Sequence, residues 1–268
     1  MTDADLPVVR LRPKAEARAI RHGFPWVYSD ELVLDRRTQG MAPGSFALLE
    51  DAERRPLAVV TVNPASRIAA RVMDREPSAR MGRDWIAARI ARALEMRERL
   101  YDAPHYRLVH AEADGLPGVV IDRFGDTAVI QPNAAWAEAM VSDIAAALTQ
   151  VTGVTTVVKN GAGRARALEG LAEETLVLIG KVEGPVPVLM NGATYMADVL
   201  GGQKTGLFFD QRDNHAFAAR LAKGARVLDE SALSDVFGIE MAEVAAAPKA
   251  PRQTARPGRK TANGAVRT

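Results

Sequence analysis

The segment GGQKTGLFFDQRDN, residues 201–214, is followed by a helical pattern and then by the apolar run RVLD at residues 226–229. Two glycines open the segment as an irregular loop, and residues 210–222 have the pattern of a helix that Gly224 would end. The run at 226–229 has the pattern of a short buried strand ending in an acid, Asp229. In an α/β domain the first parallel strand begins in this way, with its carboxyl end facing a ligand. The segment therefore predicts the beginning of an α/β Rossmann-like domain.

The glycines and the lysine of this segment suggest a phosphate-binding P-loop, but their spacing does not match. A P-loop has a glycine immediately before the lysine and another five residues earlier, and Gln203 and Asp198 occupy those positions relative to Lys204. What remains is a flexible loop leading into a helix whose first amides could hold an anion or a carboxylate. The alternative is an ordinary capped helix start, with Asp210 as the cap and Asp213 at the third position.

Residues 7–80 have the pattern of a small, mostly β domain. Apolar residues alternate over short spans such as residues 57–62. Phe24, Trp26 and Tyr28 also alternate, which places three rings on one face of an extended segment. Alternating aromatic residues belong more often to a core than to a surface on which bases stack.

Residues 81–185 combine helical and extended patterns, which predicts a compact α+β domain. Asp84 is the expected cap of a first helix, and Asn133 the expected cap of a second. The expected apolar stripes of these helices consist of Ile86, Ile90, Leu94 and Leu100, and of Trp136, Met140, Ile144 and Leu148. Strands are expected at residues 118–121, 127–130, 154–159 and 175–182.

Residues 186–247 are expected to begin the Rossmann-like domain with a strand pair around Val188 and Tyr195. The formal net charge is +2, but six of the 35 lysines and arginines lie in residues 248–268, which contain no acid, so the rest of the chain has 29 basic and 33 acidic residues. With few large apolar residues, this basic tail is expected to be disordered, although it could hold RNA phosphates loosely. Overall charge alone does not identify a nucleic-acid partner.

The composition is that of a soluble globular protein, with 47% hydrophobic and 25% charged residues. No apolar run approaches the ~18 residues that a membrane span needs, and the acidic N-terminal sequence lacks the features of a signal peptide. We therefore expect a cytoplasmic protein with no membrane partner. The chain contains no cysteine, which excludes disulfides, thiolate metal sites and cysteine nucleophiles.

Four stretches resemble, in order, the family of S-adenosylmethionine-dependent 23S ribosomal RNA cytosine-5 methyltransferases with an N-terminal PUA domain, of the large-subunit methyltransferase I type. They are residues 10–28, 113–125, 157–160 with 168–171, and 201–214, and the resemblance covers about residues 7–229. It implies a multidomain fold: a PUA-like RNA-binding domain, the α+β central domain and a Rossmann-like methyltransferase domain. It also implies S-adenosyl-L-methionine as the cofactor, ribosomal RNA as the partner and a homodimer.

The resemblance further implies roles for individual residues. RNA phosphates would lie near Arg12, Lys14, Arg18, Arg21 and His22. The methyl donor would be bound by Gln203, Lys204, Thr205, Phe208, Asp210, Gln211, Arg212 and Asp229. Lys204 and Arg212 could neutralise a carboxylate or a phosphate, and Phe208 or Phe209 could cover an adenine or the flipped target base. The alternatives are that the basic residues form a solvated face and that the two phenylalanines pack the loop against a sheet.

After Asp229 the sequence departs from the pattern of this family. The family continues with a glycine-containing turn that lets the backbone approach the donor, whereas residues 230–238 are ESALSDVFG. The thiolate that would activate cytosine at carbon 5 is also absent. We therefore expect residues 230–268 to replace the catalytic segment, by truncation or frameshift, and the chain to lack catalytic residues and activity. The alternatives are an RNA-binding protein without catalysis and a non-functional fragment.

Overall fold

The computed structural model describes residues 6–202 and 205–222. Residues Met1–Ala219 form one compact unit, and Arg220–Thr268 belong to a second. Gln203, Lys204, Asp229, the strand expected at residues 226–229 and the basic tail all lie outside the described residues. Within the described ranges, no helix is long and apolar enough to cross a membrane, and no group of three or more His, Asp or Glu residues is placed to hold a metal ion.

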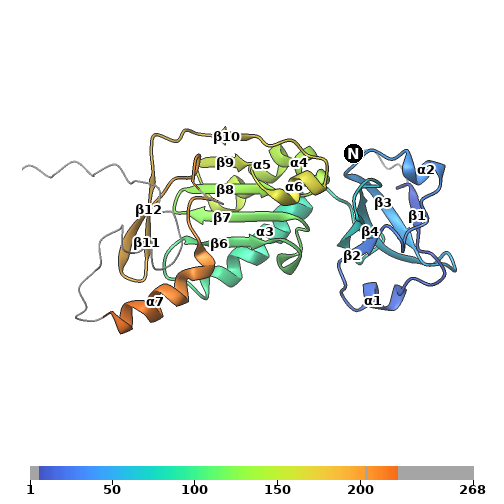
Figure 1. Ribbon diagram of the computed structural model, residues 1–268, viewed down its shortest axis with the longest axis horizontal. Coiled ribbons are helices and arrows are strands. Elements are labelled where there is room, and N and C mark those ends of the chain that lie inside the picture. The colour runs from blue at the N-terminus through green and yellow to red at the C-terminus, as the bar shows by residue number, and fades with distance from the viewer. Residues whose placement is uncertain (1–5, 203–204, 223–268) are drawn as a thin grey trace, which may run out of the picture. The chain divides into compact units, whose positions relative to one another are not determined.

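The first sheet is formed by the blue to cyan part of the chain in Figure 1. It has five strands in the order β1-β3-β4-β5-β2. The strands are β1 (Val8–Arg10), β2 (Trp26–Tyr28), β3 (Ser45–Glu50), β4 (Pro56–Val62) and β5 (Ile68–Asp74). β1 pairs with β3 in parallel, and the other pairs are antiparallel. Two short helices, α1 (Ala17–Arg21) and α2 (Arg36–Gln39), connect the strands. This part of the chain is mostly β, as the sequence predicted.

The alternation expected over residues 57–62 is not reflected in burial, because every residue of β4 from Leu57 to Val62 is buried. Val60 packs in the core of the first sheet, whereas Val59 belongs to the core that lies under the second sheet. A strand covered on both faces has no solvent side to fill with polar residues. The three alternating rings of residues 24, 26 and 28 do lie together, with centroids 6.2 to 6.5 Å apart.

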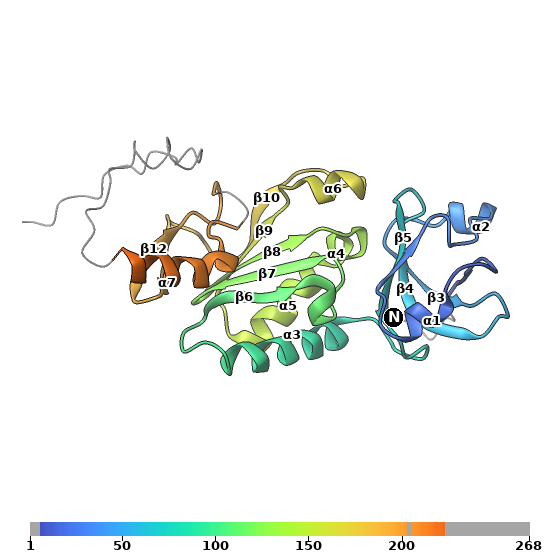
Figure 2. The same cartoon turned by 60° about the horizontal axis from the view of Figure 1, so that its bottom comes forward.

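The second sheet has the order β10-β9-β8-β7-β6, and only β8 and β9 are parallel. Its strands are β6 (His105–His110), β7 (Val119–Phe124), β8 (Thr127–Pro132), β9 (Thr156–Asn160) and β10 (Thr175–Ile179). Two helices in contact with each other, α3 (Arg83–Glu98) and α5 (Val141–Thr152), cover one face of the sheet (Figure 2). These elements form the predicted α+β domain.

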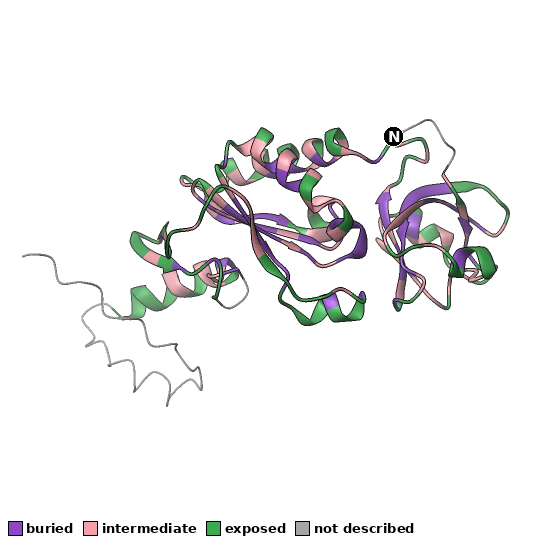
Figure 3. Cartoon of the chain, turned by 90° about the horizontal axis from the view of Figure 1, so that it is seen from above, coloured by how far each residue is buried: buried purple, intermediate pink, exposed green. Residues whose placement is uncertain are grey.

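The other face of the second sheet packs against a hairpin of β11 (Val186–Met190) and β12 (Ala193–Ala197). Val188 pairs with Tyr195 in this hairpin, which confirms the expected strand pair. The chain then passes through a 3-10 turn, η2 (Phe209–Gln211), into α7 (Arg212–Leu221), so the α-helix begins two residues later than expected. Buried residues follow the strands of both sheets, whereas α7 buries none (Figure 3).

Both predicted helix caps of the central domain were wrong. Gly82 is the N-cap of α3, so Asp84 lies inside the first turn, where a negative charge is still favourable. The helix expected after Asn133 is divided into α4 (Ala135–Ala139) and α5, and Ala134 is the N-cap of α4. The stripe residues before and after this break are buried in one core, because α4 and α5 both pack on the same sheet.

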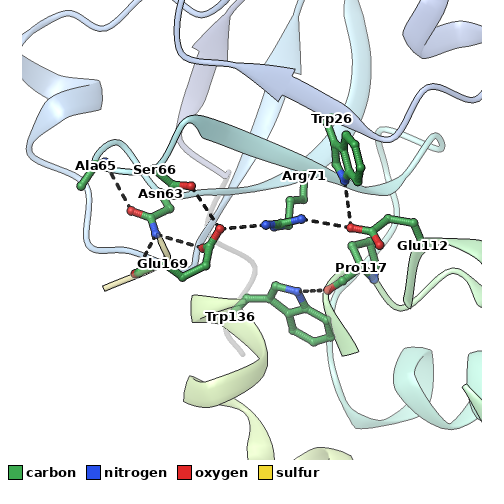
Figure 4. Close-up of polar contacts among 9 residues, drawn as sticks. All are labelled: Trp26, Asn63, Ala65, Ser66, Arg71, Glu112, Pro117, Trp136 and Glu169. Carbon is green, nitrogen blue, oxygen red and sulfur yellow. Dashed lines mark hydrogen bonds and ion pairs between the residues drawn. The ribbon is translucent and has the colours of Figure 1, made fainter. Parts of the chain in front are cut away.

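Arg71 of β5 lies between two carboxylates of the central domain, Glu112 and Glu169 (Figure 4). Its two terminal nitrogens are 3.0 Å and 2.8 Å from the carboxylate oxygens of Glu112 and Glu169, and its side chain is 12% exposed. Trp26 also donates to Glu112, and Asn63 donates to Glu169. Glu112 lies in η1 (Ala111–Asp114), and Glu169 directly follows α6 (Arg164–Leu168). These contacts join the first sheet to two separate segments of the central domain.

Replacing Arg71 with alanine should lower the free energy of unfolding by about 3 kcal/mol, because two largely buried carboxylates would lose their common partner. The measurement is a urea unfolding curve. Arg83→Ala is the control, since it removes an ion pair with Asp143 in which both side chains are more than a third exposed, and such pairs contribute less than about 1 kcal/mol. Equal losses in the two variants would contradict the structural role of Arg71.

Candidate functional site

The loop after β12 folds tightly around Asp198. The Asp198 carboxylate accepts hydrogen bonds from the backbone N–H groups of Leu200 (3.1 Å) and Gly201 (2.9 Å). A β-carbon on Gly202 or Gly206 would come within 2.3 Å or 2.6 Å of the Asp198 carbonyl oxygen, and Gly206 has a φ of +106°. Side chains do not fit at these two positions, so the glycines fix the path of the loop.

Thr205 anchors this loop to the second sheet. Its hydroxyl, which is fully buried, donates a hydrogen bond of 2.5 Å to Asp122 of β7. Asp122 is also fully buried, and it accepts two hydrogen bonds from the guanidinium of Arg107 on β6, at 2.9 Å and 3.1 Å. A buried carboxylate is stable only when it is paired and hydrogen-bonded. The Asp122 side chain therefore depends on both Arg107 and Thr205.

Phe209 and Arg212 also pack towards the central domain. Phe209 is 8% exposed, and its ring centroid is 5.1 Å from that of Phe124. The Arg212 guanidinium lies 4.4 Å from the centre of the Tyr101 ring and donates to the backbone carbonyl of His105. Phe209 thus packs the loop against the sheet, which was one of the two interpretations of the phenylalanine pair.

Phe208, Asp210 and Gln211 remain nearer to the surface, with Asp210 exposed and the other two half-buried. Burial acts to lower the pKa of Arg107, but the hydrogen bond and charge of Asp122, together with the charge of Asp210, raise it. Asp210 therefore lies within electrostatic range of the half-buried Arg107, which pairs with the buried Asp122. The described candidate donor residues are close together in the sequence, within residues 205–212, and two of them, Thr205 and Arg212, contact other parts of the protein.

The candidate RNA-contacting residues lie before, within and directly after α1, and all five are exposed. Lys14 and Arg18 have no ion-pair or side-chain hydrogen-bond partner among the described residues. Arg21 pairs at 2.8 Å with Asp51, whose side chain is 1% exposed. Arg12 donates to the carbonyl of Leu32, so it also has a structural partner. Lys14 and Arg18 are accordingly the cations most available to a phosphate.

His22, the fifth candidate, is tied to its own helix. Its Nδ1 lies 2.8 Å from the carbonyl oxygen of Arg18. It follows α1 as the C-cap residue. This position lets the ring close the end of the helix and leaves its other nitrogen at the surface.

The sequence interpretation assigned no role to Asp122 or Arg107. Asp122 lies in the largely apolar strand β7, where a charged residue that must be buried usually has a partner. That pattern marks Asp122 as a residue with a buried partner, but it does not identify Thr205, which is 83 positions away. Only the packing of the hairpin and loop on the sheet brings the two together.

Thr205→Val should destabilise the loop, because valine has nearly the shape of threonine but leaves Asp122 without one of its donors. We expect a loss of roughly 1–3 kcal/mol in the free energy of unfolding, measured by urea denaturation. Thr194→Val on β12, where the side chain is exposed, is the matched control and should change stability very little. Identical unfolding curves for Thr205→Val and the unmodified chain would show that the hydroxyl does not support Asp122.

Residues 9–75 match the family model of the PUA-like domain. The chain is 34% identical over 246 residues to the ribosomal RNA large subunit methyltransferase of Deinococcus radiodurans, covering 87% of this chain and 59% of that protein. It is 32% identical over 249 residues to the ribosomal RNA large subunit methyltransferase I of Shewanella denitrificans, covering 89% and 61%. The chain thus spans about three fifths of the length of these relatives.

Two solved structures share the fold. One is "a putative sam-dependent methyltransferase from Streptococcus mutans", with a TM-score of 0.66 and 17% identity over 82% of this chain and 55% of that one. The other is described as "a putative methyltransferase complexed with SAH", with a TM-score of 0.64 and 16% identity over 80% of this chain and 53% of that one. Together with the PUA-like match, these likenesses confirm the predicted multidomain fold, and the chain is similar in sequence to ribosomal RNA large subunit methyltransferases.

Proposed function

We propose that this chain is a member of the S-adenosylmethionine-dependent ribosomal RNA methyltransferases and contains their RNA-binding domain and donor loop. The observation that carries the proposal is the extent of the sequence similarity. It covers 81–89% of the chain at 29–34% identity in relatives named as ribosomal RNA large subunit methyltransferases. The similarity therefore reaches well beyond the PUA-like domain, which matches over residues 9–75 only.

The cations before and on α1 support binding to RNA. Lys14 and Arg18 are exposed and have no acidic partner among the residues in the described ranges, so binding a phosphate would not require an existing ion pair to break. Contacts to phosphates position the RNA and do not read its sequence. In this proposal the PUA-like domain holds the ribosomal RNA, while Arg12 and Arg21 stabilise the domain that presents these cations.

The contacts that hold the loop in place are an argument for a methyl-donor site near residues 203–212. Asp122 holds Thr205, and Tyr101 and His105 hold Arg212, so the residues between them have fixed ends. Phe208, Asp210 and Gln211 then provide an apolar ring, a carboxylate and an amide at the surface of this segment. When bound, S-adenosylmethionine would supply the methyl group, and Gln203, Lys204 and Asp229 would complete its site.

The proposed target is a cytosine of 23S ribosomal RNA, with methylation at carbon 5. That chemistry requires a thiolate, which adds to carbon 6 and makes carbon 5 nucleophilic. Residues 1–268 contain no cysteine, so we propose that these residues alone bind RNA but do not transfer a methyl group to carbon 5. The same observation favours the second candidate function, an RNA-binding protein that performs no catalysis.

The 268-residue chain should show no methyl transfer from tritiated S-adenosylmethionine to undermodified 23S ribosomal RNA. The measurement is acid-precipitable tritium over time. A relative that contains the cysteine is the positive control and shows that the RNA is a competent substrate. Turnover by the 268-residue chain would refute the proposed lack of catalysis, and a calorimetric titration with S-adenosylmethionine would report whether a donor site is present.

Replacing Lys14 and Arg18 together with alanine should weaken binding to ribosomal RNA and flatten its dependence on salt. Each lost phosphate contact lowers the slope of log K against log salt by roughly 0.7 to 0.9, so two contacts should lower it by about 1.5. Fluorescence anisotropy at several salt concentrations gives this slope. Arg67→Ala with Arg164→Ala removes the same charge from two exposed arginines elsewhere and should have little effect; equal slopes for the two double variants would contradict the proposed RNA face.

A further inference from the structure

A hollow of about 430 Å³ lies where the end of β5 faces α3 and η1. Its walls include Phe24, Arg75, Arg89, Arg92, Met96 and Glu112. Ligand pockets typically range from roughly 300 to 1,000 Å³, so the hollow has room for one nucleotide. It is separate from the loop at residues 198–212, and none of the residues proposed above to contact phosphates or donor lines it.

The three acids of this hollow are already neutralised. Asp74 pairs with Arg89 at 2.6 Å, Glu112 with Arg71 at 3.0 Å, and Asp114 with Arg97 at 2.7 Å. Each of these carboxylates also accepts a further hydrogen bond, from Trp85, Trp26 and the backbone of His110 respectively. The acids therefore leave no unpaired negative charge to repel an anion.

Two exposed arginines, Arg75 and Arg92, have no ion-pair or hydrogen-bond partner among the described residues, so the hollow carries two uncompensated positive charges. The Arg75 guanidinium lies directly over Gly23, where a β-carbon would be 2.9 Å from its Nη2 atom. Gly23 has a φ of +112°, which disfavours any other residue. The backbone at Gly23 thus leaves room for Arg75 to lie along the wall.

The hollow also has apolar surface beside these charges. Phe24 is 40% exposed and Met96 is 49% exposed, although both residue types are usually covered in a soluble protein. The Phe24 ring packs edge to face against Trp26, with the ring centroids 6.2 Å apart and the ring planes at 76°. An exposed ring next to two free guanidinium groups suits a ligand that combines a flat apolar face with an anion.

Phe24 connects this hollow to the surface of the PUA-like domain near Arg12 and Lys14. It also lines a second hollow with Glu16 and Trp26, and Glu16 in turn lines a third hollow together with Arg12 and Lys14. Each hollow thus shares a lining residue with the next, from Arg12 and Lys14 to Arg92 on α3. The second and third hollows are also lined by Glu16 and Glu31. A row of adjacent hollows fits an extended single strand better than an isolated small anion.

We infer that this hollow binds one nucleotide of a single-stranded segment of the RNA, with its phosphate at Arg75 and Arg92 and its base on the ring of Phe24. The inference rests on the proposed binding of RNA and adds a contact site in which α3 of the central domain takes part. Any base can stack on one ring, and the attraction between the arginines and the phosphate does not depend on the base. The site would therefore position the strand without selecting a sequence.

The test is anisotropy with a fluorescent oligouridylate of about ten nucleotides, a length within the range that single-strand sites occupy. Arg75→Ala with Arg92→Ala should weaken binding and lower the slope of log K against log salt by roughly one. Phe24→Leu keeps an apolar side chain but removes the ring, and it should weaken binding roughly five- to a hundredfold with no change of slope. Thermal melts of all variants check that they are folded.

The controls separate this inference from the proposed function. Arg75→Ala with Arg92→Ala could bind RNA as tightly as the control, Arg67→Ala with Arg164→Ala, while the double variant at Lys14 and Arg18 binds more weakly. In that case the proposed nucleotide site is wrong, but the proposed binding of RNA is not. If Arg75→Ala with Arg92→Ala weakens oligonucleotide binding but Phe24→Leu does not, the proposed stacking of the base on Phe24 is wrong. If the unmodified chain binds neither the oligonucleotide nor ribosomal RNA, both the inference and the proposed function are refuted.

Discussion

The arrangement of the first sheet on the central domain depends on one buried ionic contact, Arg71 between Glu112 and Glu169. Because the three side chains are mostly withdrawn from water, each charge is tolerable only while its partners remain in place. Glu112 lies in η1 and Glu169 follows α6, so a single guanidinium fixes two segments that are 57 positions apart in the sequence. The hollow that we assign to a nucleotide is formed by β5, α3 and η1, and its shape follows from this contact.

A second buried carboxylate, at the other end of the central domain, also depends on its partners. Asp122 is satisfied only when Arg107 and Thr205 both reach it, which fixes the loop that leads into α7. The loop and the hairpin cover the face of the second sheet that α3 and α5 leave open. The central domain is thus a sheet with two covered faces, with the PUA-like domain attached through one charge cluster and the candidate donor segment through another.

Much of the fold followed from local patterns. Four of the five strands of the central domain and the strand pair around Val188 and Tyr195 were expected from short apolar runs, whereas β6 was not expected. The clustering of Phe24, Trp26 and Tyr28 followed from period-two alternation, which needs only neighbours in sequence. The caps at Asp84 and Asn133 were predicted wrongly because cap chemistry depends on where the chain enters the helix, and tertiary packing sets that point. The full burial of β4 was not predicted, because alternation of apolar and polar residues reports only strands with one solvent-exposed face.

The sequence by itself determined that the chain has a mostly β part, an α+β part and a glycine-flexed loop before a helix, and it determined that no cysteine is available for chemistry. The tertiary structure decided which charged residues are free. Arg12, Arg21 and Arg212 look equivalent to Arg18, Arg75 and Arg92 in the sequence, yet the first three have protein partners. The side chains of the last three have no such partner within residues 6–202 and 205–222. Ion pairing depends on distances of a few ångströms between residues far apart in the chain, and only folding sets those distances.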